Sequence, residues 1–356
     1  MSSKSLPRVG ISIGDPNGIG VEVILKCFAD KRMLSFCTPV IYANTAFISA
    51  QKKALSIPIP IQGVQPVNPP LAGKVNVVSV WKEPFEVSFG KETPEAGALA
   101  LQSLEAATQA LINDEVDVLV TAPINKHNIQ QENFSFPGHT DYLAEKLGGD
   151  SLMFMVTDTL KVGLFTDHLP VKEVSAVITP ELIKKKMVLV RESLIKDFGI
   201  RKPKIAVLGI NPHTGDNGVI GSEDDAVLRP TLAELSDEGM LVFGPFAADS
   251  FFGSNAYSQY DAIIASYHDQ GLIPFKTLSF GEGVNFTAGL RKVRTSPDHG
   301  TAYEIAGKSL ANEASFRAAV FSALSIYSKR KEYAEITENV LKPSAPKPRE
   351  KKNLKL

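Results

Sequence analysis

Residues 265–307 read ASYHDQGLIPFKTLSFGEGVNFTAGLRKVRTSPDHGTAYEIAG, a stretch that is rich in charged side chains and in glycine. It shows little helical or strand periodicity, so its polar groups need partners and its glycines lose backbone entropy on folding. A segment of this kind is typical of a binding or catalytic site. The apolar run Ala262–Ala265 before it predicts a buried parallel strand. His268 and Asp269 would then follow the carboxyl end of that strand, where open α/β sheets bind their ligands.

The rest of the chain alternates apolar runs with longer segments of helical composition, bounded by glycine and proline. This alternation predicts the α/β class with a mainly parallel sheet. The segment GDPNGIG (14–20) joins the first strand to the first helix, but its spacing is not the GxGxxG of dinucleotide-binding Rossmann folds. We expect strands at 8–13, 39–42, 75–80, 116–120, 152–156, 161–165, 204–208, 241–243 and 262–265, and helices at 21–29, 45–55, 93–113, 140–147, 180–198, 222–238, 248–252 and 312–329.

With 356 residues, the chain is too long for one compact core and suits two domains. The chain is expected to return to the first domain after about residue 285, because the last helices need a sheet to cover. The first domain is therefore predicted to comprise 1–135 and 285–330, and the second 136–284. The Pro- and Lys-rich segment 342–356 is predicted to be a disordered basic tail.

Composition and charge exclude several classes of protein. The formal net charge is −1, which gives no field that would attract nucleic acid or an anionic membrane. The two cysteines, Cys27 and Cys37, lack CxxC spacing and are expected to be reduced thiols. No apolar run approaches the roughly 20 residues that span a bilayer, and the first residues lack a signal-peptide core. We therefore expect a cytoplasmic protein with neither nucleic acid nor membrane as a partner.

Three histidines occupy the same kind of position in the predicted sheet. His168, His213 and His268 each follow the end of an expected strand. Three imidazoles from three strand ends can bind one divalent ion and leave positions open for substrate and water. Zn²⁺ suits this ligand set, and Co²⁺ or Mg²⁺ would also serve as a Lewis acid. Asp249 and Asp269 could complete the site or hold an imidazole in one tautomer. The alternative is that each histidine is a polar loop residue.

Other polar residues suit an anionic ligand. His139 and Thr140 lie just before an expected helix, whose N-terminus favours a phosphate or a carboxylate. Lys276 and Arg294 are further candidates for binding an anion, and Asn285 can hydrogen-bond polar groups of a substrate. The alternative is that Thr140 is an ordinary helix cap and that Lys276 and Arg294 are charged residues of the surface. The surrounding glycines favour the functional interpretation because they allow a close backbone approach.

Several motifs resemble those of known dehydrogenases. GDPNGIGVEV (14–23) and DHGTAYEIAG (298–307) resemble two motifs of the β-decarboxylating superfamily of isocitrate and isopropylmalate dehydrogenases. The whole set resembles the 4-hydroxythreonine-4-phosphate dehydrogenase family of pyridoxal phosphate biosynthesis, from about residue 8 to residue 329. The further motifs in this set are GHT (138–140), TDHLP (166–170), NPHTGDNG (211–218), SYHDQG (266–271) and RTSPDHGTA (294–302).

This resemblance implies a fold of two α/β/α domains with a cleft between them, as in isocitrate and isopropylmalate dehydrogenases. It also implies a homodimer whose active site takes metal ligands from both subunits, with the dimer interface in the second domain. The implied reaction is NAD-dependent oxidation of the C3 hydroxyl of 4-phosphooxy-L-threonine. Metal-assisted decarboxylation to 3-amino-2-oxopropyl phosphate follows, as a step of pyridoxine 5′-phosphate biosynthesis. NAD is favoured over NADP because the sequence shows no basic cluster dedicated to a ribose 2′-phosphate.

The resemblance also assigns roles to residues of this sequence. The metal ligands are His168, His213 and His268. The substrate-binding residues are His139, Thr140, Lys276, Asn285 and Arg294. The cofactor-binding residues are Asp298, His299, Gly300, Thr301 and Gly307.

Two questions stay open at this level. The proton acceptor of the oxidation is Asp249, Asp269, Lys276 or Lys126, and the sequence does not choose among them. The substrate could instead be 4-phospho-threonate, 4-phospho-erythronate or an aromatic cis-dihydrodiol carboxylate, since sister enzymes on this scaffold act on such acids. A further alternative is a non-catalytic protein that keeps the fold and binds metal or phosphate.

Overall fold

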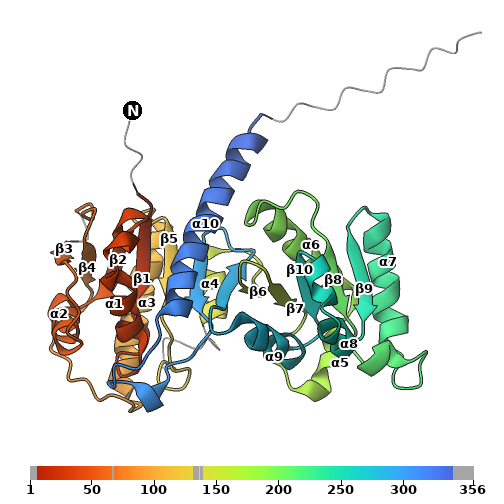
Figure 1. Cartoon of the computed structure of the whole chain (residues 1–356), viewed down its shortest axis with the longest axis horizontal. Helices are drawn as coiled ribbons and strands as arrows, with labels where there is room; N and C mark the ends of the chain where they lie inside the picture. Colours follow the sequence, from red (N-terminus) through yellow and green to blue (C-terminus); the bar gives the residue numbers. More distant parts are fainter. Residues whose placement is uncertain (1–5, 66–67, 131–135, 137–138, 340–356) are drawn as a thin grey trace, which may run out of the picture.

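The computed structural model describes residues 6–65, 68–130, 136 and 139–339, and the predicted tail 342–356 lies outside them. The described strands form one sheet in the order β3-β4-β2-β1-β5-β12-β11-β6-β7-β10-β8-β9 (Figure 1). The strands are β1 (Arg8–Ser12), β2 (Thr38–Ala43), β3 (Ile61–Val64), β4 (Val75–Ser79), β5 (Val118–Thr121), β6 (Leu152–Val156), β7 (Lys161–Leu164), β8 (Ile205–Leu208), β9 (Val242–Phe246), β10 (Ala262–Ala265), β11 (Val284–Ala288) and β12 (Arg294–Pro297). The α-helices are α1 (Gly20–Ala29), α2 (Thr45–Ala54), α3 (Pro94–Ile112), α4 (His139–Leu147), α5 (Val174–Val177), α6 (Pro180–Lys196), α7 (Arg229–Asp237), α8 (Ala248–Gly253), α9 (His268–Ser279) and α10 (Ala314–Thr337).

The sheet is parallel in both halves and antiparallel where they meet. In the first half, β1 pairs in parallel with β2 and β5, and in the second half β10 pairs in parallel with β7 and β8. At the junction, β11 pairs antiparallel with both β12 and β6, and β6 pairs antiparallel with β7. Strand β12 pairs in parallel with β5, so the chain returns to the first half of the sheet at residues 294–297. Because the sheet is continuous, the division into the two predicted domains stays a prediction.

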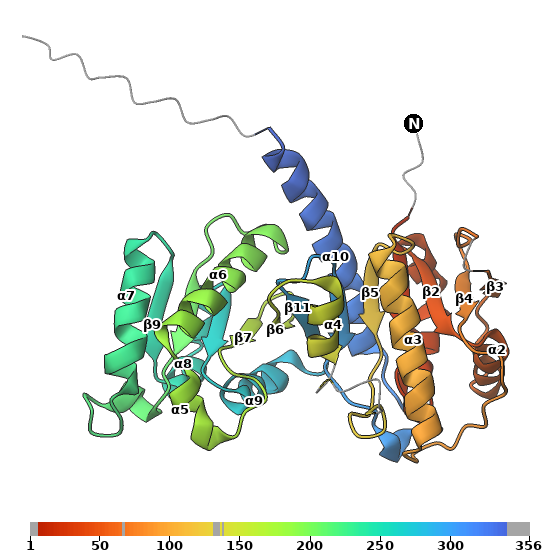
Figure 2. The same cartoon turned by 180° about the vertical axis from the view of Figure 1, so that it is seen from behind.

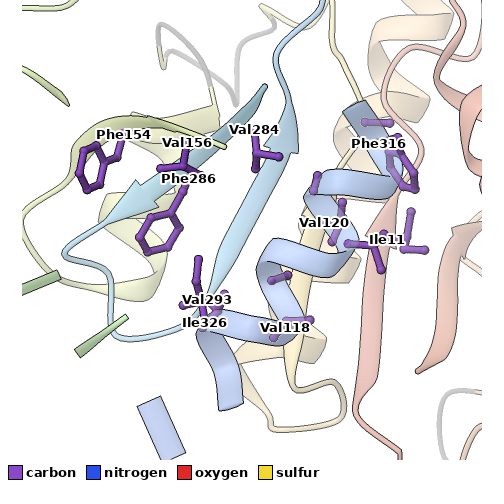
Figure 3. Packing of buried hydrophobic residues seen from close by; sticks show 14 of the residues in the cluster. Ile11, Val118, Val120, Phe154, Val156, Val284, Phe286, Val293, Phe316 and Ile326 are labelled. Atoms are coloured by element: carbon purple, nitrogen blue, oxygen red, sulfur yellow. The ribbon is translucent and has the colours of Figure 1, made fainter. Parts of the chain in front are cut away.

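Helices cover both faces of this sheet and give an α/β/α arrangement (Figures 1 and 2). Side chains alternate along each strand, so Val118 and Val120 of β5 face one core while Leu119 faces another. The first core lies under α1, α6 and α10 and runs across the junction. Figure 3 shows its centre, where Phe316 and Ile326 of α10 approach side chains of the sheet. The α/β class predicted from the sequence is confirmed.

Sequence and structure agree best where helix starts carry clear signals. Thr93 caps α3 by accepting a hydrogen bond from Ala96 N–H, and Pro94 occupies the first turn. Thr179 caps α6 in the same way. These local signals explain why the predicted and observed starts of the two helices coincide closely. In the part of the chain that the structure describes, no helix has both the length and the apolar character needed to cross a membrane.

The segment 265–307 is more regular than its sequence suggests. It forms α9, β11 and β12 in succession. Helix α9 places polar side chains at a cavity and buries Leu272 and Phe275. It also contains Pro274, which is unusual inside a helix. For both reasons the helical period of its apolar residues is hard to recognise in the sequence. Elsewhere, β3 forms within the expected loop excursion 56–74, and α10 continues past residue 329 to Thr337. The expected helix 222–238 consists of the π-helical turn η4 (Asp224–Leu228) followed by α7.

Candidate active site

A cavity of about 260 Å³ lies where the two halves of the sheet meet. Its walls come from the end of β5, from β6, β11 and β12, and from the starts of α4 and α9. Most residues that the sequence indicated converge on it. Those lining the cavity are His139, Thr140, His168, His268, Lys276, Asn285, Arg294, Asp298, His299 and Gly300. The residues indicated by the sequence that do not line it are His213, Asp249, Asp269, Thr301 and Gly307.

Arg294 is the most unusual residue of the cavity because its guanidinium is buried without a carboxylate partner. The residue is 1% exposed, and its Nη2 and Nε donate to Thr121 Oγ1 at 2.6 and 3.2 Å. Nη1 donates to Thr287 Oγ1 at 3.1 Å. No described carboxylate forms an ion pair with it, and burial lowers the pKa of the guanidinium to about 9. A buried cation normally has a counter-ion, so this site is suited to an anionic ligand.

Further cationic and unpartnered groups surround this guanidinium. Lys126 and Lys276 also line the cavity, and so do Asp141 and Asp298. Asp298 is partly engaged, since it accepts a hydrogen bond from Ser315 Oγ at 3.0 Å. The lining therefore carries one more positive than negative charge, which favours an anionic ligand.

Three side chains of the cavity wall have a buried polar atom without a partner among the described residues. They are His139 through Nε2, Asn285 through Oδ1 and His299 through Nε2. Burial lowers the pKa of His139 well below its ordinary value, and the charges of Arg294 and Lys126 lower it further. His139 is thus neutral and able to hydrogen-bond a ligand. Because buried polar atoms are usually satisfied, these three atoms are available for hydrogen bonds to a polar ligand in the cavity.

His168 and His268 face each other in the cavity. Their ring centroids are 6.0 Å apart and the ring planes meet at 38°. Partial burial lowers the pKa of His168, and Lys126 contributes in the same direction, so its imidazole is kept neutral as a metal ligand requires. His268 Nδ1 lies 2.7 Å from Asp269 Oδ1, a contact that leaves Nε2 free to bind an ion.

His213 lies apart from these two imidazoles. It belongs to the short helical turn η3 (Pro212–Gly215) and does not line the cavity. Its φ is +52°, and Thr214, Asp216 and Asn217 also have positive φ, so this loop is held in an unusual conformation. Among the described residues, no group of three or more His, Cys, Asp or Glu side chains is arranged to hold a metal ion. One chain therefore offers two of the three predicted imidazoles at the cavity.

The loop that follows β12 packs against the first glycine-rich loop of the chain. Ile19 N–H donates to the Thr301 carbonyl oxygen at 3.0 Å, and a Cβ on Gly18 would lie only 2.8 Å from that oxygen. Tyr303 OH donates to the buried Asp15 Oδ2 at 2.7 Å. The two motifs at 14–20 and 298–307 thus form one unit. Thr301 supports this unit, whereas Asp298, His299 and Gly300 reach the cavity.

Thr121 was not among the residues that the sequence indicated, although its hydroxyl accepts two hydrogen bonds from Arg294. Its position could have indicated a role, because Thr121 is the first polar residue after the apolar run of β5. Ser296 and Asp141 also line the cavity without having been assigned a role.

Comparison with known proteins identifies the family. The family model described as "Pyridoxal phosphate biosynthetic protein PdxA" matches residues 35–323. The chain belongs to the PdxA family. A relative from Bacteroides thetaiotaomicron, named 4-hydroxythreonine-4-phosphate dehydrogenase, is 47% identical over 325 residues, which are 91% of this chain and 89% of that protein. One from a Sulfurihydrogenibium species, with the same name, is 38% identical over 91% of this chain and 99% of that protein.

Solved structures support the PdxA assignment. The 4-hydroxythreonine-4-phosphate dehydrogenase of Klebsiella pneumoniae superimposes with a TM-score of 0.78 at 30% identity, over 92% of this chain and 99% of that chain. A terephthalate 1,2-cis-dihydrodiol dehydrogenase from Burkholderia xenovorans gives a TM-score of 0.60 at 26% identity, over 90% and 98% of the two chains. The resemblance found in the sequence is therefore confirmed, and with it the class of enzyme, an oxidoreductase of the PdxA family.

Proposed function

We propose that this chain catalyses the reaction after which its PdxA relatives are named. It oxidises the C3 hydroxyl of 4-phosphooxy-L-threonine with NAD, and the resulting β-keto acid loses CO₂ to give 3-amino-2-oxopropyl phosphate. The observation that carries the proposal is the buried Arg294, which lacks a carboxylate partner and lies in the same cavity as two facing imidazoles. A phosphorylated hydroxy acid presents anionic groups to such a cation and a hydroxyl to such imidazoles.

The position of Arg294 and Lys276 in the cavity supports a role for them in binding the substrate. Arg294 and Lys276 hold the anionic ends of the substrate, and the unpartnered atoms of His139 and Asn285 hydrogen-bond its polar groups. Thr140 lies in the first turn of α4, where a backbone N–H and its hydroxyl are available to an anion. Burying these interactions away from water strengthens them and fixes the substrate's orientation.

The facing imidazoles of His168 and His268 in the cavity support a divalent ion there, with two of its three proposed ligands from this chain. We propose that a second copy of the chain supplies His213, so that the complete site forms in a homodimer. Apolar side chains near these loops support such an interface, since Val171 is 75% and Val219 is 82% exposed. When bound, a Zn²⁺, Co²⁺ or Mg²⁺ ion would supply a Lewis acid for the oxygen at C3.

The cofactor is proposed to be NAD, whose adenosine end residues 298–307 would hold. Asp298, His299 and Gly300 line the cavity and are placed for this role, and a Cβ on Gly300 would meet no atom within 4 Å, so the backbone there is open to a ligand. The proton of the C3 hydroxyl needs an acceptor. Of the four candidate acceptors, Lys126 and Lys276 line the cavity, Asp269 contacts His268, and Asp249 lies elsewhere. A biosynthetic enzyme of this kind is expected to work in the cytoplasm.

A second candidate is a sister reaction on another acid. The structural likeness to a terephthalate cis-dihydrodiol dehydrogenase favours this alternative, because that enzyme keeps the same fold at 26% identity. 4-Phospho-threonate and 4-phospho-erythronate are further substrates of this type. Expression in a bacterial strain that requires vitamin B6 separates the two functions, since rescue of growth supports the first and its failure favours a sister reaction.

The decisive experiment is NADH formation by the chelator-treated protein with 4-phosphooxy-L-threonine, with and without an added divalent ion. Metal-dependent NADH formation supports the proposal. Activity on 4-phospho-threonate or 4-phospho-erythronate alone moves the protein to the sister reaction. Metal binding without NADH formation from any of these acids would identify a non-catalytic protein that keeps the fold.

A further inference from the structure

Polar side chains join the three strand ends that precede His168, His213 and His268. Thr166 Oγ1, at the end of β7, donates to the Ser266 carbonyl oxygen at 2.8 Å, just beyond β10. The buried Ser266 Oγ lies 3.3 Å from the Gly209 carbonyl oxygen, just beyond β8. The ends of β7, β10 and β8 are thus linked by hydrogen bonds that do not belong to the ladders of the sheet.

Gln270 makes the shortest of the links between β10 and β8. It is the third residue of α9, and its Oε1 accepts a hydrogen bond from Ser266 N–H at 2.7 Å. Its Nε2 donates to the Gly209 carbonyl oxygen, also at 2.7 Å. One amide group therefore fixes the start of the helix that carries His268 and ties it to the strand end that leads to His213.

Asp224 holds the chain on the other side of Gly209. This buried carboxylate accepts hydrogen bonds from Ile210 N–H at 2.8 Å and from Asn211 N–H at 2.9 Å. It belongs to the π-helical turn η4, a feature that is frequent at functional sites. The positive φ at His213 persists only because its surroundings hold it. A rigid path of hydrogen bonds thus runs from the start of α9 to the loop of His213.

We propose that Gln270 is a positioning residue of the metal site, which sets the distance between the helix start bearing His268 and the strand end leading to His213. This inference rests on the proposed function, because it takes both histidines as metal ligands. If His213 serves the second copy, Gln270 connects a ligand of one site to a ligand of the other. A change at Gln270 then weakens both sites of the dimer.

Gln270→Glu tests this role because it separates the two hydrogen bonds. Glutamate keeps an oxygen that accepts from Ser266 N–H, so the start of α9 is retained. Its other oxygen would face the Gly209 carbonyl oxygen, and that contact is repulsive rather than a hydrogen bond. Gln259→Glu is the matched control, since it makes the same change of charge at an exposed glutamine of η5 (Ala256–Gln259).

Binding of Co²⁺ to the chelator-treated full-length protein is measured by calorimetry and by the visible absorption of the bound ion. The thermal unfolding midpoint of the same protein is measured alongside. Gln270→Glu is expected to weaken Co²⁺ binding by roughly tenfold and to change the absorption spectrum, with little change in the midpoint. Gln259→Glu should match the unmodified protein. Equal Co²⁺ affinity and an equal spectrum for Gln270→Glu and the unmodified protein would overturn the proposal.

Two further outcomes remain decisive. If the unmodified protein binds no Co²⁺, the proposed metal site itself fails, and the positioning role fails with it. If Gln270→Glu does not fold, Gln270→Met takes its place, because it keeps a side chain of similar length, adds no charge and removes both the bond from Ser266 N–H and the bond to the Gly209 carbonyl oxygen. Weaker Co²⁺ binding by Gln270→Met supports the role, and unchanged binding refutes it.

Discussion

Replacing Arg294 by methionine tests whether the buried guanidinium serves the fold or the ligand. Burial lowers its pKa from 12.5 to about 9. A shift of this size corresponds to roughly 5 kcal/mol that disfavours the charged form in the free protein. Its three hydrogen bonds to Thr121 and Thr287 offset about 1 to 1.5 kcal/mol each. Arg294→Met should therefore change the free energy of unfolding of the free protein by no more than about 1 to 2 kcal/mol.

The effect on catalysis should be much larger than the effect on stability. A guanidinium that holds an anionic group makes about two charge-assisted hydrogen bonds, each worth about 1.5 to 3 kcal/mol. Losing about 3 to 6 kcal/mol lowers kcat/KM for the phosphorylated substrate by roughly 10²- to 10⁴-fold. The KM for NAD should change little, because the proposed cofactor contacts lie in the loop after β12.

Steady-state kinetics and urea unfolding of the same preparations measure both effects. Arg291→Met is the matched control, since Arg291 is exposed and lies three residues earlier in the chain. The reasoning is refuted if Arg294→Met destabilises the free protein by several kcal/mol while kcat/KM for the substrate stays near normal. Such a result would mean that Arg294 stabilises the sheet and binds no ligand.

Other substitutions test other parts of the proposal. His213→Ala should abolish metal binding and activity while leaving the unfolding midpoint nearly unchanged, and near-normal turnover would remove His213 from the metal site. His139→Asn should make the protein less sensitive to acid: His139 is kept neutral in the fold, so the unfolded state binds more protons below about pH 6.5 and stability falls as the pH drops. When the free energy of unfolding is measured from pH 7 to 5, it should fall less steeply in the variant than in the unmodified protein. An equally steep fall in both proteins would contradict the burial of a neutral imidazole. Deleting 342–356 should leave kcat/KM unchanged, because no predicted site residue lies there; a strong loss would assign the tail a role in catalysis.

The sequence predicted the alternation of strands and helices, and it indicated ten residues that the structure brings to one cavity, because both leave local signals. Apolar runs marked the strands, and His168 and His268 stood just beyond two of them. Convergence of these residues on one cavity followed from the parallel sheet, whose carboxyl ends lie at one edge.

What could not be predicted depends on partners that are distant in the sequence. Thr121, which holds Arg294, lies 173 residues before it, so no local pattern announced that this arginine would be buried without a carboxylate. The same limit applies to His213, because its position past a strand end was like that of the other two histidines, yet it does not line the cavity. Helix α9 was not predicted for another reason. Its polar residues line the cavity and interrupt the helical period of its apolar residues.

The pairing of β12 with β5 bears on how the chain folds as it is synthesised. The first half of the sheet ends at β5, and its edge stays unpaired until residues 294–297 have emerged. Helix α10 then covers the same region, where Tyr327 OH donates to Asp117 Oδ1 at 2.8 Å. The N-terminal half thus cannot complete its core ahead of the rest, as a separate N-terminal domain would. During translation the exposed edge of β5 is a site for mispairing between nascent chains, and fragments that end before residue 294 should aggregate.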